Sequence, residues 1–313
     1  MLRHALKTLS AIRGPKLSIF IFHRVLSEPD PLFPGEIDIA RFDRIVGWIT
    51  SWFDVLPLSD AVERLSHGDL GAGKACITFD DGYADNLTNA TPVLRNHNVH
   101  ATFFIATDFI DGGRMWNDTV IESIRGTAQS GIDCEWLGLG NVLLDSVADR
   151  KTALERIIPA IKHLPGERRA EAVSRLEALC GASLPDDLML SSRQLSDLHG
   201  SGMGIGAHTR SHPILAKTDP ARARLEISES RDYLEAALGE RIGLFAYPNG
   251  KPGVDYLPEH VAMVKDLGFD AAVSTAWGAS RPQDSLFELK RFTPWDSTRG
   301  RFGLRVLKNL AQG

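Results

Sequence analysis

The feature that most limits the fold of this chain is a series of short apolar runs that alternate with helical segments. The runs occupy residues 17–22, 75–79, 101–106, 203–208, 242–247 and 270–275. They are rich in β-branched and aromatic residues and are bounded by Gly, Pro or Asp, which is typical of buried strands. Strands that alternate with helices favour a mainly parallel sheet, either open or closed into a barrel. The sequence therefore predicts an α/β fold.

The clearest helix lies between two of these runs, at residues 219–239. Asp219 is a suitable N-cap, Pro220 occupies the first helical position, and Gly239 follows the last turn. These residues predict where the helix begins and ends.

Residues 112–200 interrupt the alternation. No convincing strand occurs there, and residues 151–164 and 166–180 both have the pattern of amphipathic helices. We therefore expect one α/β domain that spans residues 1–313, with residues 112–200 as a helical insertion in one of its loops.

The composition excludes several classes of protein. The net charge of −5 gives no electrostatic footprint for nucleic acid. Cys76, Cys134 and Cys180 are widely spaced, so neither a disulfide framework nor a cysteine zinc site is indicated. The segment before Pro15 lacks the apolar core of a signal peptide, and no run is long enough to span a membrane. We expect a soluble, cytoplasmic protein that could meet its substrate at the inner face of the membrane.

Polar residues that could bind a metal or take part in catalysis follow several of the predicted strands. In parallel α/β folds, functional groups collect at the C-terminal ends of the strands. The residues at these ends are Asp80 and Asp81, His208, His23, and the stretch from Tyr247 to Gly250. The architecture would therefore bring them to one edge of the sheet.

His208 and His212 are separated by three residues in "HTRSH". Glycines precede the pair and Pro213 follows it, which favours a strand end that runs into a loop. Alone, the pair could be two polar loop histidines, and the two aspartates could be a polar turn. Together, two imidazoles and a carboxylate suit a divalent transition metal, zinc first, with an open position for water. A metal bound by Asp81 and both histidines would offset the repulsion between the adjacent carboxylates. Asp80 would then be free either to support the metal ligands or to react.

Three motifs of the sequence resemble those of a known protein family. "TFDDGY" followed by "HTRSH" resembles the first two motifs of the NodB-homology polysaccharide deacetylases, carbohydrate esterase family 4, and "FAYPNG" resembles the third. The resemblance covers about residues 17 to 293. It implies a deformed (β/α) barrel and a divalent metal cofactor, zinc first, with cobalt or nickel as alternatives. By position it implies that Asp80 is the general base and that Asp81, His208 and His212 bind the metal.

The general acid departs from the usual pattern of this family. Many members supply it as a histidine near the C-terminal end of the domain, but "LFELKRFTPWD" at residues 286–296 contains none. His23, at the end of the first strand, resembles the acid of the biofilm poly-N-acetylglucosamine deacetylases, in which the motif order is permuted. We expect His23 to be the general acid, with a capping or core-edge role as the alternative.

The third motif also departs from the pattern. Family members often carry an arginine two residues before its proline, where this chain has Ala246. Arg291 is the candidate to replace it and to orient the base. We expect the backbone N–H of Tyr83 to help hold the oxyanion, and Tyr247 and Asn249 to contact the substrate or the oxyanion.

The resemblance implies a metal-dependent hydrolase that removes N-acetyl groups from N-acetylhexosamine units of an exopolysaccharide or its precursor. The expected partner is thus an N-acetylated oligo- or polysaccharide substrate. Two alternatives remain open: a hydrolase of small cyclic imides or amides with the same fold, and a non-catalytic carbohydrate-binding relative. The intact set of Asp80, Asp81, His208 and His212 argues against a pure binder.

Overall fold

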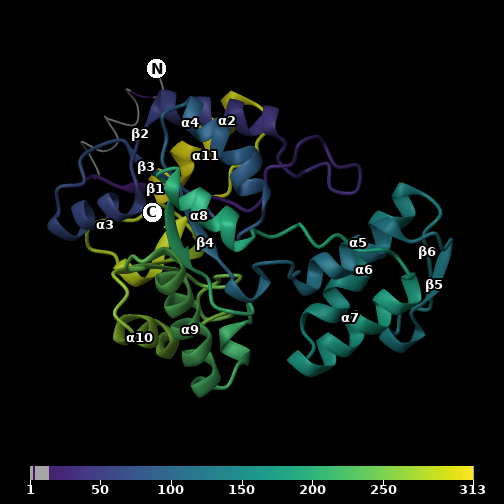
Figure 1. Cartoon of the computed structure of the whole chain (residues 1–313). Helices are drawn as coiled ribbons and strands as arrows, with labels where there is room; N and C mark the ends of the chain where they lie inside the picture. Colours follow the sequence, from purple (N-terminus) through teal and green to yellow (C-terminus); the bar gives the residue numbers. More distant parts are fainter. Residues whose placement is uncertain (1–2, 4–13, 313) are drawn as a thin grey trace. The chain divides into compact units, whose positions relative to one another are not determined.

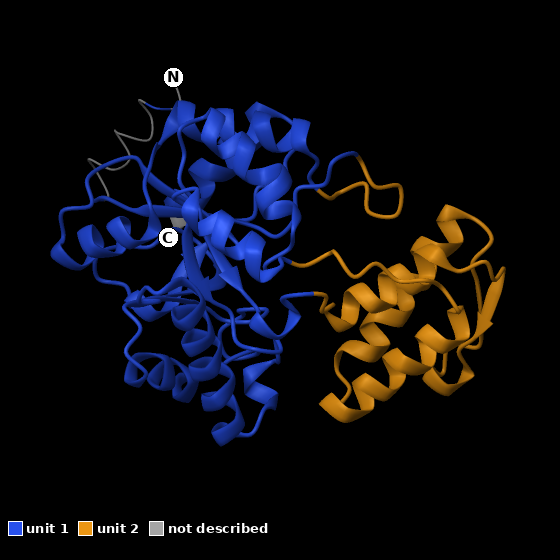
Figure 2. Ribbon diagram, viewed as in Figure 1, with its two compact units in different colours: residues 1–28, 37–111, 190–313 blue, residues 29–36, 112–189 orange. Residues whose placement is uncertain are grey.

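The computed structural model describes residue 3 and residues 14–312 of the chain. The chain divides into two compact units, which Figure 2 draws in different colours. Unit 1 comprises residues 1–28, 37–111 and 190–313, and unit 2 comprises residues 29–36 and 112–189, as far as these ranges are described. The segment before Pro15, on which the signal-peptide expectation rests, lies outside the described residues apart from Arg3 and Gly14.

The main sheet of unit 1 is built from parallel strands. They are β1 (Leu17–Phe22), β2 (Asp54–Val55), β3 (Lys74–Phe79), β4 (Thr102–Ile105), β7 (Gly204–Ala207), β8 (Leu244–Ala246), β9 (Ala271–Trp277) and β10 (Leu289–Arg291). The strand order is β1-β3-β4-β7-β8-β9-β10, and β2 pairs with β3 outside this path.

The two ends of this path meet. Phe292, the residue after β10, forms a parallel bridge with Phe20 of β1. Its N–H donates to the Ile19 carbonyl at 2.8 Å, and its carbonyl accepts from the Ile21 N–H at 3.1 Å. The sheet is therefore a nearly closed barrel, and the expected deformed (β/α) barrel is confirmed.

Helices surround the barrel (Figure 1). They are α2 (Ile39–Trp52), α3 (Leu58–His67), α4 (Thr91–Asn96), α8 (Ser192–Gly200), α9 (Pro220–Leu238), α10 (Pro258–Asp266) and α11 (Arg299–Gln312). The predicted limits of α9 are confirmed, because the Asp219 carboxylate caps the N–H of Ala221 at 2.9 Å and Gly239 ends the helix with φ of 70°.

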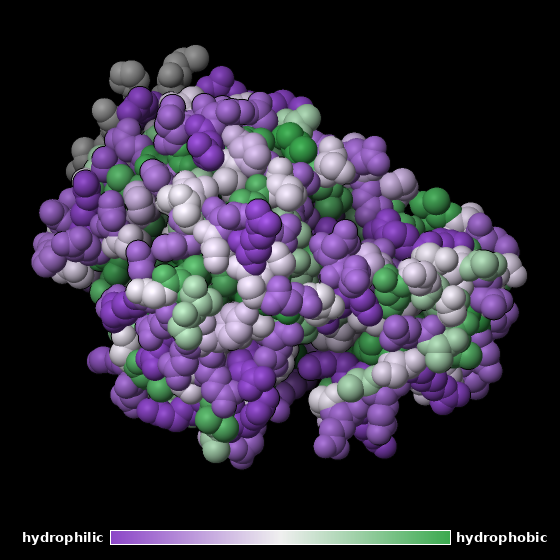
Figure 3. Space-filling model, viewed as in Figure 1, coloured by the Kyte–Doolittle hydropathy of each residue, from purple (hydrophilic) through white to green (hydrophobic). Residues whose placement is uncertain are grey.

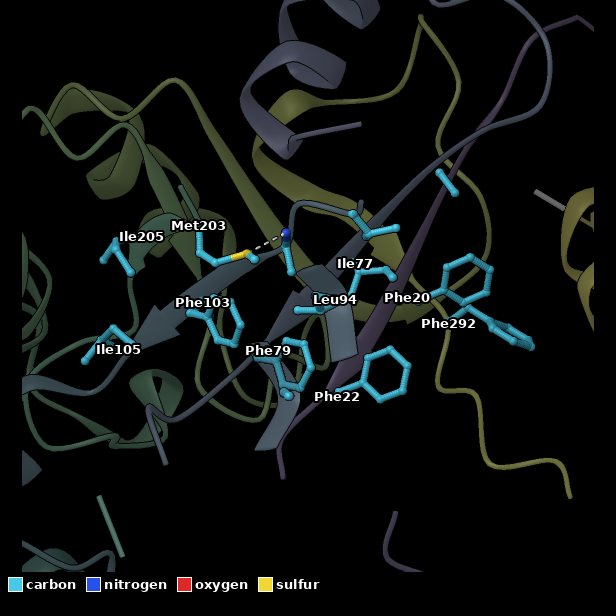
Figure 4. Close-up of a cluster of buried hydrophobic side chains, with 14 of the residues drawn as sticks. Phe20, Phe22, Ile77, Phe79, Leu94, Phe103, Ile105, Met203, Ile205 and Phe292 are labelled. Carbon is cyan, nitrogen blue, oxygen red and sulfur yellow. Dashed lines mark hydrogen bonds between the residues drawn. The ribbon is translucent and has the colours of Figure 1, made fainter. Parts of the chain in front are cut away.

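The strands have two apolar faces, because successive side chains of a strand point to opposite sides. One face packs against the helices and includes Phe22, Phe79 and Phe103, whose neighbouring rings lie together in Figure 4. The other face fills the barrel interior and includes Ile19 and Phe104. This alternation decides which side chains at the strand ends face the interior.

Unit 2 has its own apolar core, formed by helices and a hairpin. Its elements are α5 (Trp116–Gly126), β5 (Gly131–Asp133), β6 (Asn141–Leu143), α6 (Val147–Lys162) and α7 (Gly166–Cys180). The expectation of no strand in this region is wrong, because β5 and β6 form an antiparallel pair. Three residues each are too few to show an alternating pattern. The interpretation of residues 112–200 as an insertion into one catalytic domain stays a prediction.

The hydropathy of the described residues can be examined along the helices and on the surface. None of their helices is both long and apolar enough to cross a membrane. On the face drawn in Figure 3, hydrophobic residues are scattered among hydrophilic ones.

The interior packing can be tested at Gly206 of β7. A methyl group there would lie 2.5 Å from the Phe104 ring and 3.0 Å from the Leu244 carbonyl oxygen. We expect Gly206→Ala to lower the free energy of unfolding by about 1–3 kcal/mol in urea denaturation, because the closely packed ring and backbone would have to shift to admit the methyl group. The control Gly200→Ala, at the open end of α8, should change it by less than about 1 kcal/mol. Equal losses in the two variants would contradict this packing.

Candidate metal centre

The three predicted metal ligands come together at the C-terminal ends of β3 and β7. The Nε2 atoms of His208 and His212 each lie 3.5 Å from Asp81 Oδ1. The two imidazole rings are 4.8 Å apart between centroids. One ligand atom from each of the three residues lies within 4.8 Å of the others.

The loops that carry these ligands have unusual backbone conformations. Asp81, Thr209 and His212 have φ of 79°, 63° and 54°, a region that residues other than glycine rarely adopt. Hydrogen bonds hold two of these positions: the Ala106 N–H donates to the Asp81 carbonyl at 3.2 Å, and the Thr107 N–H to the Thr209 carbonyl at 3.3 Å. Strain of this kind persists only where surrounding contacts enforce it, and it clusters at functional sites.

Glu226 of α9 fixes the loop between the two histidines. Its buried carboxylate accepts from the N–H groups of Arg210 at 3.1 Å and Ser211 at 2.8 Å. It also accepts from the Ser211 hydroxyl at 2.9 Å and from Arg222 at 2.7 Å. Glu226 is not among the site residues that the sequence predicts.

A signal for Glu226 does exist in the sequence. Ala223, Ile227 and Leu234 form the buried stripe of α9, and Glu226 lies on the same face. A carboxylate on an apolar stripe is seldom buried without partners, so it could have been flagged as a residue that holds a loop.

The tautomer of His208 follows from one hydrogen bond. Its Nδ1 lies 2.8 Å from the Ala246 carbonyl oxygen, which can only accept, so Nδ1 carries the proton. In the neutral ring, Nε2 then presents a lone pair toward Asp81. A donor fixed in this way from behind is typical of metal-binding histidines.

The electrostatics of the three residues favour a cation. Burial raises the pKa of Asp81, but the imidazoles of His208 and His212 lower it well below its usual range. Burial lowers the pKa of His208, but the carboxylates of Asp81 and Asp80 raise it by more, so the pKa lies above its usual value. Burial chiefly lowers the pKa of His212, to about 4, so this ring is neutral at neutral pH. The carboxylates that attract a proton to His208 would equally attract a divalent ion.

The spacing of these atoms fits a divalent metal. Two donors about 2.1 Å from a tetrahedral ion are about 3.4 Å apart, close to the 3.5 Å that separates Asp81 Oδ1 from either Nε2. That separation is longer than a good N–H···O hydrogen bond. Two imidazole nitrogens and one carboxylate oxygen are a donor set that zinc and similar ions accept.

Asp80 is paired with Arg291 instead. The guanidinium Nη1 and Nη2 donate to the two carboxylate oxygens at 2.6 and 2.7 Å, and Nε donates to the Ser274 carbonyl at 2.8 Å. Both side chains are almost completely buried. Burial raises the pKa of Asp80, but Arg291 and His208 outweigh it and hold the pKa below its usual range. Asp80 is thus ionised at neutral pH, against the residue proposed to orient it.

His23 lies beside this group. Phe22 pairs with Phe79 in the β1–β3 register, and the Asp80 N–H donates to the Phe22 carbonyl at 3.0 Å, so His23 and Asp80 leave adjacent strands together. Burial raises the pKa of Asp81, and His23 is among the groups that lower it. The His23 side chain is exposed.

Tyr247 has a structural role in the outer layer. Its ring stacks on Tyr256 with centroids 3.8 Å apart, and its hydroxyl donates to the Phe287 carbonyl at 3.0 Å. The reason is the strand alternation, which turns Ala246 to the interior and Tyr247 to the helices. The expected contact of Tyr247 with the substrate or the oxyanion stays a prediction.

The other predicted substrate residues lie in the motif turns. Tyr83 is buried, with the Arg24 guanidinium 4.6 Å from its ring centroid. Asn249 has φ of 59°, and its carbonyl accepts from the Thr275 hydroxyl at 2.8 Å. Their roles stay predictions.

The family model described as polysaccharide deacetylase matches residues 67–136 and 158–272, and the chain therefore belongs to this family. It is 19% identical over 278 residues to YxkH of Bacillus subtilis (strain 168), provisionally named a polysaccharide deacetylase. That match covers 88% of this chain and 70% of YxkH.

Two solved structures share the fold. The deacetylase PplD of Streptococcus pyogenes, in complex with acetate, is 18% identical with a TM-score of 0.61, and the match covers 94% of this chain and 98% of PplD. IcaB from Ammonifex degensii is 19% identical with a TM-score of 0.60, and the match covers 93% and 98% of the two chains.

The metal site can be tested by removing one ligand at a time. We expect Asp81→Asn and His212→Ala to weaken zinc binding by at least about 100-fold, since even the loss of a supporting residue costs 10–100-fold. Competition with a chromophoric chelator measures this affinity. The control His199→Ala removes an imidazole that pairs with Glu240 at 3.1 Å, and it should bind zinc as the wild type does. Unchanged affinity in both ligand variants would exclude this site.

Proposed function

We propose that the protein is a metal-dependent deacetylase that hydrolyses N-acetyl groups on N-acetylhexosamine units of an exopolysaccharide or its precursor. One observation carries the proposal: an ionised, buried Asp80, held by Arg291, beside three residues whose spacing fits a metal. Membership of the polysaccharide deacetylase family and the acetate complex of the similar structure PplD support it.

The hydrolysis of an amide needs both a strong nucleophile and a proton for the leaving amine. A divalent ion held by Asp81, His208 and His212 would polarise the acetyl carbonyl and make water more acidic. Asp80 accepts the proton of the attacking water, a contribution of about 10²–10⁴-fold for a well-placed base. Arg291 keeps this carboxylate charged and holds both of its oxygens in place.

His23 protonates the departing amine. Its exposure lets it reach a substrate, and its place beside Asp80 brings it to the mouth of the barrel. An acid histidine that precedes the aspartate pair agrees with the permuted type of deacetylase. The turn that carries Asp81 also presents the Tyr83 N–H, which is the candidate oxyanion donor.

The activity is tested by acetate release from N-acetylglucosamine oligomers with the zinc-loaded protein. We expect turnover in the wild type and a loss of at least about 100-fold in Asp80→Asn with zinc still bound, because the base is removed and the ligands remain. Small cyclic imides serve as comparison substrates. Turnover of the imides alone would favour the small-amide hydrolase, and a zinc-loaded protein inactive on both would favour a binding role.

The role of Arg291 is tested by the pH dependence of kcat/KM. Asp80 acts as a base only when ionised, so activity falls as the pH drops through its pKa. Burial raises this pKa and Arg291 is the chief group that lowers it. Arg291→Ala should therefore move the acidic limb of the profile to higher pH, and Arg291→Lys should move it less. An acidic limb that stays in place in Arg291→Ala would remove this residue from the mechanism.

A further inference from the structure

Side chains from the turn after the aspartate pair bind the main chain just beyond β1. The Asn86 Nδ2 donates to the His23 carbonyl at 2.8 Å. The Asn89 Nδ2 donates to the Val25 carbonyl, also at 2.8 Å. The strand ladder between β1 and β3 ends with the bond between the Asp80 N–H and the Phe22 carbonyl. Past that point, side-chain hydrogen bonds continue the connection.

An ion pair strengthens the same connection. The Arg24 Nε lies 2.8 Å from Asp85 Oδ2, and the Val25 N–H donates to Asp85 Oδ1 at 3.2 Å. The residues on both sides of His23 are thus bound: Phe22 by the sheet and Arg24 by Asp85. Its own carbonyl depends on Asn86.

Asn86 is itself held rigidly. Its side chain has no exposed surface, and its Nδ2 also donates to Asp85 Oδ1 at 3.2 Å. It begins a π-helical turn, Asn86–Ala90, and its carbonyl accepts from the Thr91 hydroxyl at 2.7 Å. Turns of this kind are rare and are frequently found at functional sites.

One atom of this side chain is costly to the fold. The Asn86 Oδ1 is buried, and it has no hydrogen-bond partner within the described part of the chain. A buried acceptor left unpaired destabilises the folded state. An apolar residue of similar volume would avoid this cost, so the amide is better explained by what its Nδ2 holds than by stability.

We propose that Asn86 is a positioning residue that fixes His23 against the segment bearing Asp80 and Asp81. The inference rests on the proposed function, in which His23 is the general acid. Asn86 lies six residues beyond Asp80 along the chain, so one short segment carries the proposed base, a proposed metal ligand and the support of the acid. The distance between acid and base is then set by this segment.

The test separates two kinds of leaving group. In an N-acetyl sugar the C–N bond breaks as His23 gives its proton to the amine nitrogen. In 4-nitrophenyl acetate the C–O bond breaks and the phenolate leaves with the electron pair, so no proton is needed. A misplaced acid should therefore slow the amide and spare the ester.

We expect zinc-loaded Asn86→Ala to lose about 10–100-fold in kcat on N-acetylglucosamine oligomers, as a displaced catalytic group does. Its kcat on 4-nitrophenyl acetate should change by less than about threefold, because the base and the ligands remain. Asn86→Leu keeps the number and branching of the side-chain heavy atoms and removes the amide, so it repeats the test if the alanine variant does not fold. The matched control is Asn89→Ala, which frees Val25 and leaves the bond to His23; it should retain the wild-type ratio of the two activities.

A double-mutant cycle adds a readout that a merely structural role would not move. In the His23→Ala background, Asn86→Ala should have no further effect on the amide, because it acts only through the removed imidazole. Zinc affinity and thermal unfolding are measured for every variant.

Equal losses on both substrates, additive effects in the cycle, or full amide turnover in Asn86→Ala would each overturn the positioning role. Failure of the proposed function would look different: the wild type would release no acetate from the oligomers, or His23→Ala would keep full amide turnover.

Discussion

The rest of the site depends on the buried ion pair between Asp80 and Arg291. Transfer of two charges out of water costs several kcal/mol per ion, and only good geometry with further hydrogen bonds offsets it. Here the guanidinium binds both carboxylate oxygens, and its Nε binds the Ser274 carbonyl. The pair joins β3 to β10, which both flank β1 in the nearly closed barrel. Removal of either partner would leave the other charge buried and uncompensated, so the fold and the chemistry share one contact.

The alternation of side chains along the strands explains why Arg291 can hold this position. Residues of β10 that share its face, such as Leu289, lie in the interior cluster. In the third motif, the residue of β8 that faces the interior is Ala246. Its side chain is too small to reach the Asp80 carboxylate. The arginine that binds Asp80 comes instead from β10, which is separated from β8 by β9 in the sheet. The same alternation carries Tyr247 outward to the helices.

The sequence predicted the features whose causes are local. Strand runs and the caps of α9 depend on neighbouring residues, and the predicted metal ligands lie in short motifs. The hairpin of β5 and β6 escaped because three-residue strands carry no periodic signal. Glu226 and Asn86 escaped for another reason. They act on Ser211 and His23, which lie 15 and 63 residues away along the chain, so only the fold brings the partners together.

Glu226 and Asn86 have the same physical role, which is to hold main-chain segments beyond the ends of the strands. At the mouth of the barrel the strand ladders end, yet the proposed metal ligands and the proposed acid must keep fixed positions. Main-chain groups beyond the ladders need other partners, since unpaired buried groups destabilise the fold. Glu226 supplies acceptors to the strained loop between the histidines, and Asn86 supplies a donor to the segment that carries His23. Buried polar side chains thus extend the rigidity of the sheet to loops that the sheet cannot reach, and the geometry of the site is set by them as much as by its motifs.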